Sequence, residues 1–316
     1  MAEKYYKKKA GEGKAQSRHI LYAFLFLLSL GFVFLLFFSL ISLGTGGPIM
    51  GECVAVVEVN GPLTTEDIPA SLFADGMAGS YRVAQKIEAL NERDDVGAVL
   101  FVINSPGGSV VATNEIYRAV DSLEKPKVSY FREVAASGGY YIATPSNYII
   151  SEPNALTGSI GVIATFLEME ELLSNIGVSE VVIKSGAMKD MGNPFRNMTE
   201  EERALMDEVV AEIFKEFMGV IIEQRGNKLN MPLFNGVTDG RVLTGRMAYD
   251  AGLVDQLGTR DDALAKAAEL GGMEFETVDD IPVCKVDVSV KQAGLFDMKS
   301  LFGLPESQGS VKLQYR

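Results

Sequence analysis

Apolar residues in this chain fall into two patterns, short continuous runs and longer stripes that recur every three or four positions. The short runs predict β-strands at residues 53–59, 98–103, 127–131, 147–151 and 178–183. The longer stripes predict amphipathic helices at residues 81–94, 111–123 and 199–224. Glycine-containing turns separate strands from the helices that follow them. This order predicts an α/β domain with substantial parallel pairing.

One apolar stretch is too long for a globular core. Residues 20–43 form a run of 24 residues without a charge, which as a helix would extend roughly 36 Å, enough to cross a bilayer. A cleaved secretory signal is the alternative, but its apolar core is usually only ~7–15 residues long. We therefore expect an uncleaved transmembrane anchor at residues 20–43, with a basic cytoplasmic segment at residues 1–19 before it.

The rest of the chain is then expected outside the cytoplasm, in the periplasm or on the external surface. We expect a linker at residues 44–52, an exported domain at residues 53–279, and a largely mobile C-terminal extension at residues 280–316. The extension is predicted from its loss of periodicity and its polar end.

Charge is distributed unevenly. The first 19 residues carry six basic and two acidic side chains, a net charge of +4. Since the whole chain has a net charge of −13, the remainder has a net charge of −17. Such an acidic body argues against nucleic acid as a partner, because phosphate binding needs basic patches.

The inventory of metal-ligating and catalytic residue types is short. His19 is the only histidine, so the exported part can hold neither a Ser-His-Asp triad nor a histidine-ligated zinc ion. Cys53 and Cys284 could form one disulfide, but two separate, small buried residues are the favoured interpretation. We expect no cofactor and no metal.

A serine among small residues is the candidate nucleophile. Ser137 follows the strand predicted at residues 127–131 and precedes two glycines, which leaves its hydroxyl uncrowded. The amides of Gly138 and of Gly108, in a second glycine turn, could face a developing negative charge. The alternatives are a helix N-cap serine and an ordinary strand-to-helix turn.

Without histidine, a lysine is the remaining common base for a serine. A lysine can serve only if desolvation lowers its pKa from the reference value of about 10.4. Lys184 and Lys189 both follow the strand predicted at residues 178–183, and Lys189 lies among apolar neighbours, Ala187, Met188 and Met191. The alternative for either lysine is a solvated surface charge.

Five motifs occur in order over about residues 53–270. They are Ser105-Pro106-Gly107-Gly108, Ala135-Ala136-Ser137-Gly138-Gly139-Tyr140-Tyr141, Leu156-Thr157-Gly158-Ser159-Ile160-Gly161-Val162, Lys184-Ser185-Gly186 with Lys189-Asp190, and Asp239-Gly240-Arg241. This ordered set resembles the short, single-domain form of signal peptide peptidase A. A more distant likeness is to the proteolytic subunit of Clp protease, which uses a histidine that this domain lacks.

The resemblance implies a Clp/crotonase-like fold of repeated ββα units behind one N-terminal transmembrane helix. It implies a Ser-Lys dyad with Ser137 as nucleophile and Lys189 as general base, and Ser159 as the residue that orients the lysine. The amides of Gly108 and Gly138 would form the oxyanion hole. Met188 and residues 193–195 match no family position that we can identify.

The resemblance also implies partners. The protein would be a single-pass protease of the cell membrane, a homo-oligomer whose sites combine residues of neighbouring protomers. Its substrates would be signal peptides left in the membrane and other unfolded peptides, with small or apolar side chains near the scissile bond. The alternatives are a stomatin-directed membrane protease, a crotonase-like coenzyme A thioester enzyme and an inactive oligomeric scaffold.

Overall fold

The computed structural model describes residue 29 and residues 53–68 and 76–290. The chain divides into two units, residues 1–51 and 52–316. Apart from the helical Ser29, the predicted membrane span at residues 20–43 lies outside the described residues. Within those described ranges, no helix combines the length and apolarity needed to cross a bilayer.

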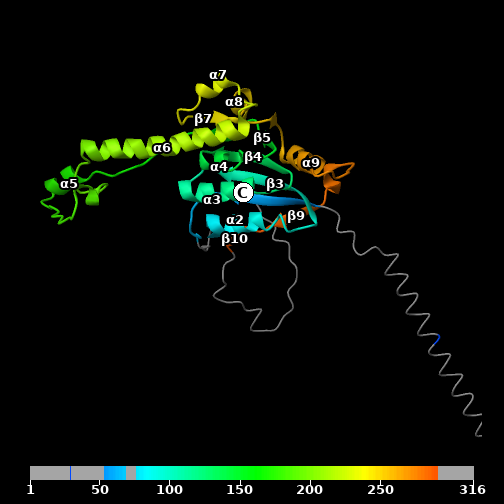
Figure 1. Ribbon diagram of the computed structural model, residues 1–316, viewed down its shortest axis with the longest axis horizontal. Helices are drawn as coiled ribbons and strands as arrows, with labels where there is room; N and C mark the ends of the chain where they lie inside the picture. Colours follow the sequence, from blue (N-terminus) through cyan, green and yellow to red (C-terminus); the bar gives the residue numbers. More distant parts are fainter. Residues whose placement is uncertain (1–28, 30–52, 69–75, 291–316) are drawn as a thin grey trace, which may run out of the picture. The chain divides into compact units, whose positions relative to one another are not determined.

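The second unit is built on an eight-stranded sheet whose main path runs β7-β6-β4-β3-β1-β9 (Figure 1). Every pairing in it is parallel except that between β6 and β7. β2 (Gly76–Met77) and β10 (Ser289–Val290) form a separate antiparallel pair. The strands of the large sheet are β1 (Cys53–Asn60), β3 (Val96–Ser105), β4 (Lys127–Ala136), β5 (Tyr148–Ser151), β6 (Leu156–Gly158), β7 (Val242–Thr244), β8 (Gln256–Leu257) and β9 (Val283–Val286).

The sheet forks along β4, and the fork creates the site. The first half of β4 pairs with β5, from Val128 to Phe131, whereas its last residues pair with β6, from Val134 to Ala136. β5 in turn pairs with β8. The carboxyl ends of β4 and β6 therefore lie next to each other, with the end of β3 on the other side of β4, where Ser105 pairs with Ala135.

Helices connect and cover these strands. The structure bears out the predicted mixed α/β class. The helical elements are α2 (Ser80–Glu88), α3 (Val110–Asp121), α4 (Gly138–Tyr141), α5 (Glu170–Asn175), η1 (Ala187–Asp190), α6 (Glu200–Arg225), α7 (Met231–Asn235), α8 (Gly245–Asp250), α9 (Arg260–Leu270) and η2 (Val278–Asp280).

The central strands are buried on both faces, as their continuous apolar sequence predicts. Along β1, Ala55 and Val57 pack into one hydrophobic cluster with residues of α2, α3, α4 and α6. Val54 and Val56 point the opposite way, into a second cluster that includes Ala263 of α9. Each of the fully buried valines contributes about 1.5–3 kcal/mol relative to an exposed one.

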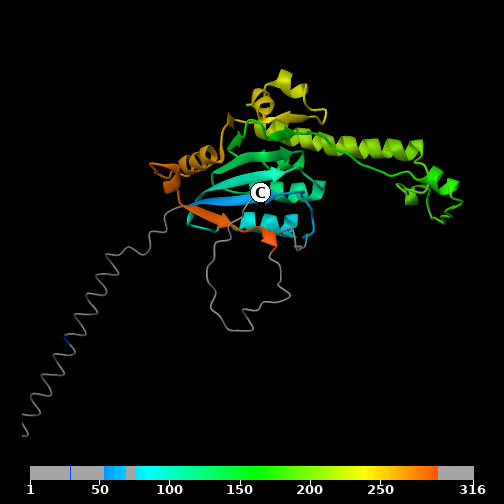
Figure 2. The same cartoon turned by 180° about the vertical axis from the view of Figure 1, so that it is seen from behind.

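The longest helix, α6, is fixed at both ends. A capping box begins it, with Thr199 accepting a hydrogen bond from the Glu202 N–H and the Glu202 carboxylate accepting one from the Thr199 N–H. At the other end, the buried Arg225 donates to both carboxylate oxygens of Asp255, at 2.8 and 3.1 Å. Figures 1 and 2 show α6 extending from the sheet toward α5.

Two predicted elements differ from the structure. The helix predicted at residues 81–94 ends at Glu88, and residues 178–183 form no strand. Val181 and Ile183 are 85% and 97% exposed. A strand needs a partner strand, and the described part of this chain offers none beside this segment.

Residues 280–290, which the sequence assigns to the C-terminal extension, contain two short strands. β9 pairs in parallel with β1 at the edge of the sheet (Figure 2), and β10 pairs with β2. β9 has only four residues, too few for periodicity alone to reveal a strand. Residues 291–316 lie outside the described residues.

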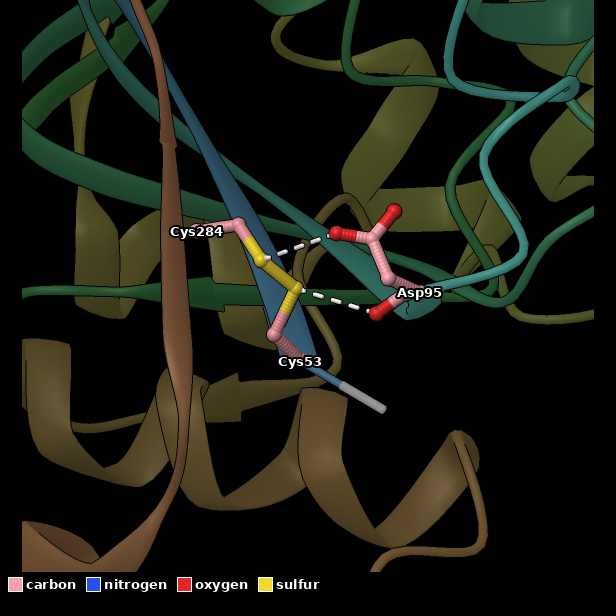
Figure 3. A group of neighbouring side chains, drawn as sticks. All are labelled: Cys53, Asp95 and Cys284. Atoms are coloured by element: carbon pink, nitrogen blue, oxygen red, sulfur yellow. Dashed lines mark hydrogen bonds between the residues drawn. A yellow bond between two sulfur atoms is a disulfide. The ribbon is translucent and has the colours of Figure 1, made fainter. Parts of the chain in front are cut away.

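A disulfide joins Cys53, the first residue of β1, to Cys284 in β9 (Figure 3). The favoured prediction of two separate cysteines is therefore wrong. The register already opposes Ala55 to Cys284, which brings the Cα atoms of the two cysteines to 5.8 Å. No sequence pattern gives this pairing, because the cysteines are 231 positions apart.

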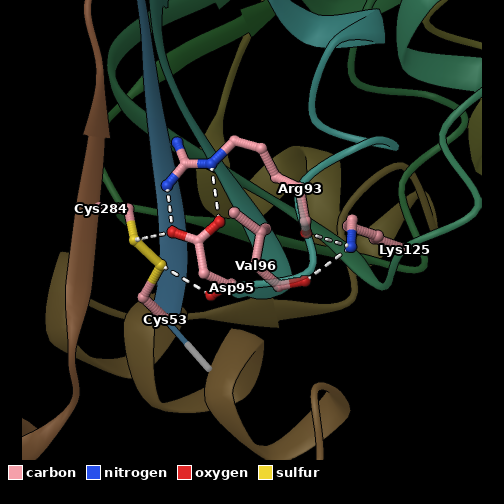
Figure 4. The surroundings of a disulfide bond; sticks show 6 residues. All are labelled: Cys53, Arg93, Asp95, Val96, Lys125 and Cys284. Atoms are coloured by element: carbon pink, nitrogen blue, oxygen red, sulfur yellow. Dashed lines mark hydrogen bonds and ion pairs between the residues drawn. A yellow bond between two sulfur atoms is a disulfide. The ribbon is translucent and has the colours of Figure 1, made fainter. Parts of the chain in front are cut away.

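Asp95 lies against the disulfide. Its carbonyl oxygen is 3.1 Å from the Cys53 Sγ, and its Oδ2 is 3.9 Å from the Cys284 Sγ. Arg93 donates to the Asp95 carboxylate, and Lys125 donates to the carbonyl oxygens of Arg93 and Val96 (Figure 4). With both sulfurs in the disulfide, this group offers no thiolate to a metal ion.

Candidate active site

Ser137 stands at the carboxyl end of β4, between the strand and α4. Its backbone has φ 53° and ψ −120°, in the left-handed half of φ that serine rarely adopts. Its N–H donates to the carbonyl oxygen of Gly158, at 2.8 Å. Such strain persists only where surrounding contacts impose it, and it is concentrated at functional sites.

The Pro-Gly-Gly turn after β3 is fixed from one side by Leu63. The Leu63 N–H donates to the carbonyl oxygen of Gly107, and the Ser109 N–H donates to that of Leu63, both at 2.9 Å. In this parallel bridge, the N–H of Gly108 itself faces away from Leu63. A Cβ on Gly108 would collide with the Leu63 carbonyl oxygen. Only glycine fits here.

The two glycine turns touch each other. Gly107 has φ +91°, and a Cβ built on it would lie 2.5 Å from the amide nitrogen of Gly138. A Cβ on Gly138 would collide with Oγ1 of Thr113. Among the described residues, neither the Gly108 N–H nor the Gly138 N–H has a hydrogen-bond acceptor. Both amides therefore remain available to an oxyanion beside Ser137.

A pocket of about 120 Å³ opens in front of Ser137. Besides the serine and the two glycines, its walls come from α3, α4, the segment after β6, and α6. They comprise Val110, Thr113, Asn114, Tyr141, Gly161, Val162, Ile163, Ile213, Glu216 and Phe217. The mostly apolar walls suit an apolar segment of a peptide.

Ser159 lies one strand away from Ser137. It follows β6 as Ser137 follows β4, it is half-buried, and it also has a positive φ, 48°. Its N–H donates to the carbonyl oxygen of Arg241, at 2.9 Å. The structure thus brings together four of the five predicted site residues, which are Gly108, Ser137, Gly138 and Ser159.

The fifth, Lys189, is not in this group. It lies exposed in η1, and its neighbour Asp190 accepts hydrogen bonds from Arg196, which also pairs with Glu202 at the start of α6. Eleven residues of helix, about 16 Å, separate Glu202 from the pocket residue Ile213. Within one chain, Lys189 therefore does not line the pocket.

Lys184, the other candidate base, is engaged elsewhere. Its Nζ donates to Oδ1 of Asp190, at 2.5 Å, and to the carbonyl oxygen of Ala187. Arg196 and Lys184 together hold the pKa of Asp190 far below its ordinary value, mainly through hydrogen bonds to the charged form. Asp190 thus fixes η1. Lys189, unlike Lys184, forms no ion pair with any of the described residues.

Sequence reasoning missed several residues of the site. Arg196 was not singled out, although it joins η1 to α6. Phe217 belongs to the apolar stripe of the helix predicted at residues 199–224, and in the structure it lines the pocket beside Tyr141. Helical spacing identifies the apolar face of α6 but not what packs against each turn. No sequence signal therefore tells a core residue of this helix from one that lines the pocket.

Comparison with known proteins assigns the chain to a family. The family model described as peptidase family S49 matches residues 119–274, and that of Clp protease matches residues 75–155. Both ranges include Ser137 and its glycines at 138 and 139.

Individual relatives are also named as proteases or peptidases. A Synechocystis protein named "Putative protease slr0021" is 35% identical over 73% of this chain and 85% of its own length. A Methanocaldococcus jannaschii protein named "Putative protease MJ0651" is 34% identical over 69% of this chain. An Enterococcus faecium protein named "Putative signal peptide peptidase SppA" is 33% identical over 67%. The alignments span 66% of the archaeal protein and 61% of the Enterococcus protein.

The fold and the Ser137 turn thus define a serine peptidase of the Clp-like α/β class. The chain belongs to peptidase family S49.

Proposed function

We propose that this chain is a membrane-anchored endopeptidase that degrades signal peptides left in the membrane, with Ser137 as nucleophile and Lys189 of a neighbouring protomer as general base. One observation carries the proposal. Ser137 sits on a left-handed turn that lines an apolar pocket, beside two glycine amides without acceptors among the described residues. This is the arrangement that acyl transfer requires.

The proposed chemistry runs through an acyl-enzyme. The Ser137 hydroxyl adds to the peptide carbonyl while its proton passes to a neutral Lys189 amine. The Gly108 and Gly138 amides donate to the oxyanion, and the lysine then protonates the departing amine. Water repeats the sequence to release the acyl group as a carboxylate. Losing one oxyanion donor costs about 3 kcal/mol of transition-state stabilisation.

Exposed apolar residues support a site completed by a second protomer. In the single chain, Leu205 and Val209 on α6 are each 39% exposed, and Ile163 after β6 is 89% exposed. Large apolar side chains that are open to water in one chain often mark an interaction surface. A homo-oligomer would bury them and could bring η1 of one protomer to Ser137 of another.

The sequence and the pocket support the membrane anchor and the substrate class that we propose. A span at residues 20–43 would hold the domain at the outer face of the membrane, preceded by a cytoplasmic N-terminus. Repeated ββα units are the finer fold that we propose for the domain. Signal peptides are apolar, and the pocket walls are mostly apolar. The name of the Enterococcus relative agrees with this substrate class.

A subunit-mixing experiment tests the shared site. We expect Ser137→Ala and Lys189→Ala each to abolish peptide hydrolysis, and an active-site phosphonate to label Ser137 in the unmodified protein. Mixed oligomers of the two variants should regain activity, because some sites would combine an intact serine with an intact lysine. Near-normal turnover by Lys189→Ala would remove this lysine as the base. Absence of recovery despite demonstrated subunit exchange would contradict the shared site.

A further inference from the structure

The pocket in front of Ser137 has an aromatic wall. The ring of Tyr141 packs edge-on against Tyr117, with centroids 5.0 Å apart, and is tilted against Phe217, with centroids 4.9 Å apart. Tyr141 and Phe217 both line the pocket and are at least 94% buried, with 6% and 5% of their surfaces exposed. Aromatic faces attract cations, and they also pack against aliphatic stems.

One carboxylate stands at this wall. Glu216 precedes Phe217 on α6 and lines the same pocket, exposed to solvent. Its one hydrogen bond among the described residues is a long one, 3.4 Å, from the side-chain amide of Asn114. No lysine or arginine in the described ranges forms an ion pair with it, including Lys215 beside it on the helix and Arg118 on α3.

The charge of Glu216 reaches the aromatic wall. Burial is the main cause that raises the pKa of Tyr141, and the Glu216 carboxylate raises it further, while Arg118 opposes the shift. The carboxylate is thus close enough to act on a group in the pocket, and it lies on the pocket side of α6. A cation entering along Tyr141 would meet it.

We infer that Glu216 is a specificity-determining residue that selects substrates with a lysine or arginine near the scissile bond. The basic side chain would lay its aliphatic stem along Tyr141 and Phe217 and place its charged head at the Glu216 carboxylate. The preferred substrates are then apolar peptides that carry a basic residue beside the apolar segment. This inference rests on the proposed function, because it assigns a preference to the same site.

A matched peptide series tests the preference. Fluorogenic peptides would share one apolar sequence and carry lysine, glutamine or glutamate at one position, placed in turn at each of the three residues before the scissile bond. At one position, we expect kcat/KM for the lysine peptide to exceed that for the glutamine peptide about tenfold. Raising the salt concentration should reduce this ratio.

Variants of α6 assign the effect to its residue. Glu216→Gln should reduce the lysine preference to about twofold or less, and Glu216→Lys should favour the glutamate peptide. Glu208→Gln is the control, since Glu208 is also exposed on α6, carries the same charge, does not line the pocket and lies about two turns before Glu216. It should keep the full preference. A lysine preference that survives Glu216→Gln, or none at any of the three positions, would overturn the inference.

A binding measurement separates this inference from the proposed function. In the full-length Ser137→Ala variant, fluorescence anisotropy should show tighter binding of the lysine peptide than of the glutamine peptide, and Glu216→Gln in that background should remove the difference. Equal binding overturns the role of Glu216 even if hydrolysis is observed. Absence of phosphonate labelling at Ser137 overturns the proposed function. The role of Glu216 is then still decided by the binding measurement.

Discussion

Ser137 and Ser159 occupy equivalent positions at the carboxyl ends of two neighbouring parallel strands. β4 and β6 pair through Ala136 and Gly158, the residues just before the two serines. The Ser137 N–H donates to the Gly158 carbonyl oxygen, and both serines have left-handed φ values, 53° and 48°. This hydrogen bond therefore fixes the backbone of the proposed nucleophile, Ser137, relative to the residue that precedes Ser159.

This relationship predicts a positioning role for Ser159. Ser159→Ala should lower kcat about 10- to 100-fold with little change in KM, since the proposed lysine base would lose the hydroxyl that orients it. The melting temperature should stay nearly constant, because the Ser159 N–H keeps its bond to Arg241. Steady-state kinetics with one peptide would check this. Ser185→Ala, an exposed serine in the segment before η1, is the control. Equal kcat for both variants would exclude the role.

The glycine turn predicts a large effect from one added methyl group. Gly108→Ala would push a Cβ into the Leu63 carbonyl oxygen, so the turn must shift and carry its amide away from the proposed oxyanion position. We expect kcat/KM to fall at least about 100-fold. The control is Gly219→Ala in α6, where a Cβ meets nothing within 4 Å. That variant should gain about 0.5–1 kcal/mol of stability. An active Gly108→Ala enzyme would contradict the oxyanion assignment.

The disulfide predicts a stability effect that depends on redox conditions. Cys53→Ser and Cys284→Ser should each reduce the free energy of unfolding by about 2–4 kcal/mol. Reduction should produce a similar loss in the unmodified protein, but none in either variant. Denaturant titrations with and without dithiothreitol would measure both effects. Two titratable thiols in the folded, unreduced protein would show that the bond is not formed.

The buried ion pair at the end of α6 predicts a pH effect. Burial alone would raise the pKa of Asp255, but hydrogen bonds from Arg225, the Ile149 N–H and Lys228 outweigh it and hold the pKa below its ordinary value. Because the folded pKa is lower than the unfolded value of about 3.9, the stabilisation is complete above that range. It is lost as the pH falls through the folded pKa.

Asp255→Asn should therefore cost about 3–5 kcal/mol at pH 7, since it leaves a buried guanidinium unpaired. Its stability should also change less than that of the unmodified protein between pH 5 and pH 2. Urea titrations across this pH range would compare the two slopes, with Asp250→Asn, an exposed carboxylate on α8, as control. Parallel pH profiles would contradict the assignment.

The elements of the site that depend on local sequence were predictable. The strand at residues 127–131 and the helix after residue 199 both have the expected identity, because burial on both faces and a capping box leave clear patterns. Gly108 and Ser137 could be singled out because a turn that points amides into a cleft needs glycine. The proximity of Ser159 also follows once β4 and β6 are parallel neighbours.

What could not be predicted depends on contacts between distant residues. Cys284 pairs with Cys53 only because β9 adds to the sheet edge next to β1, and a four-residue edge strand leaves little periodicity. Val181 and Ile183 have strand-forming sequence but no partner strand in the described chain. In the sequence, Glu216 does not differ from other charged residues on a helix surface. Only the fold shows that it lines the pocket.

The link between β1 and β9 also bears on mechanics. A pull on the chain ahead of residue 53 would load β1 lengthwise, so that its hydrogen bonds to β3 and β9 on either side would have to shear together. The covalent bond sits at the point of loading and would pass tension directly into β9. A domain held at this end should therefore resist unfolding from its first strand when force acts on the chain ahead of it.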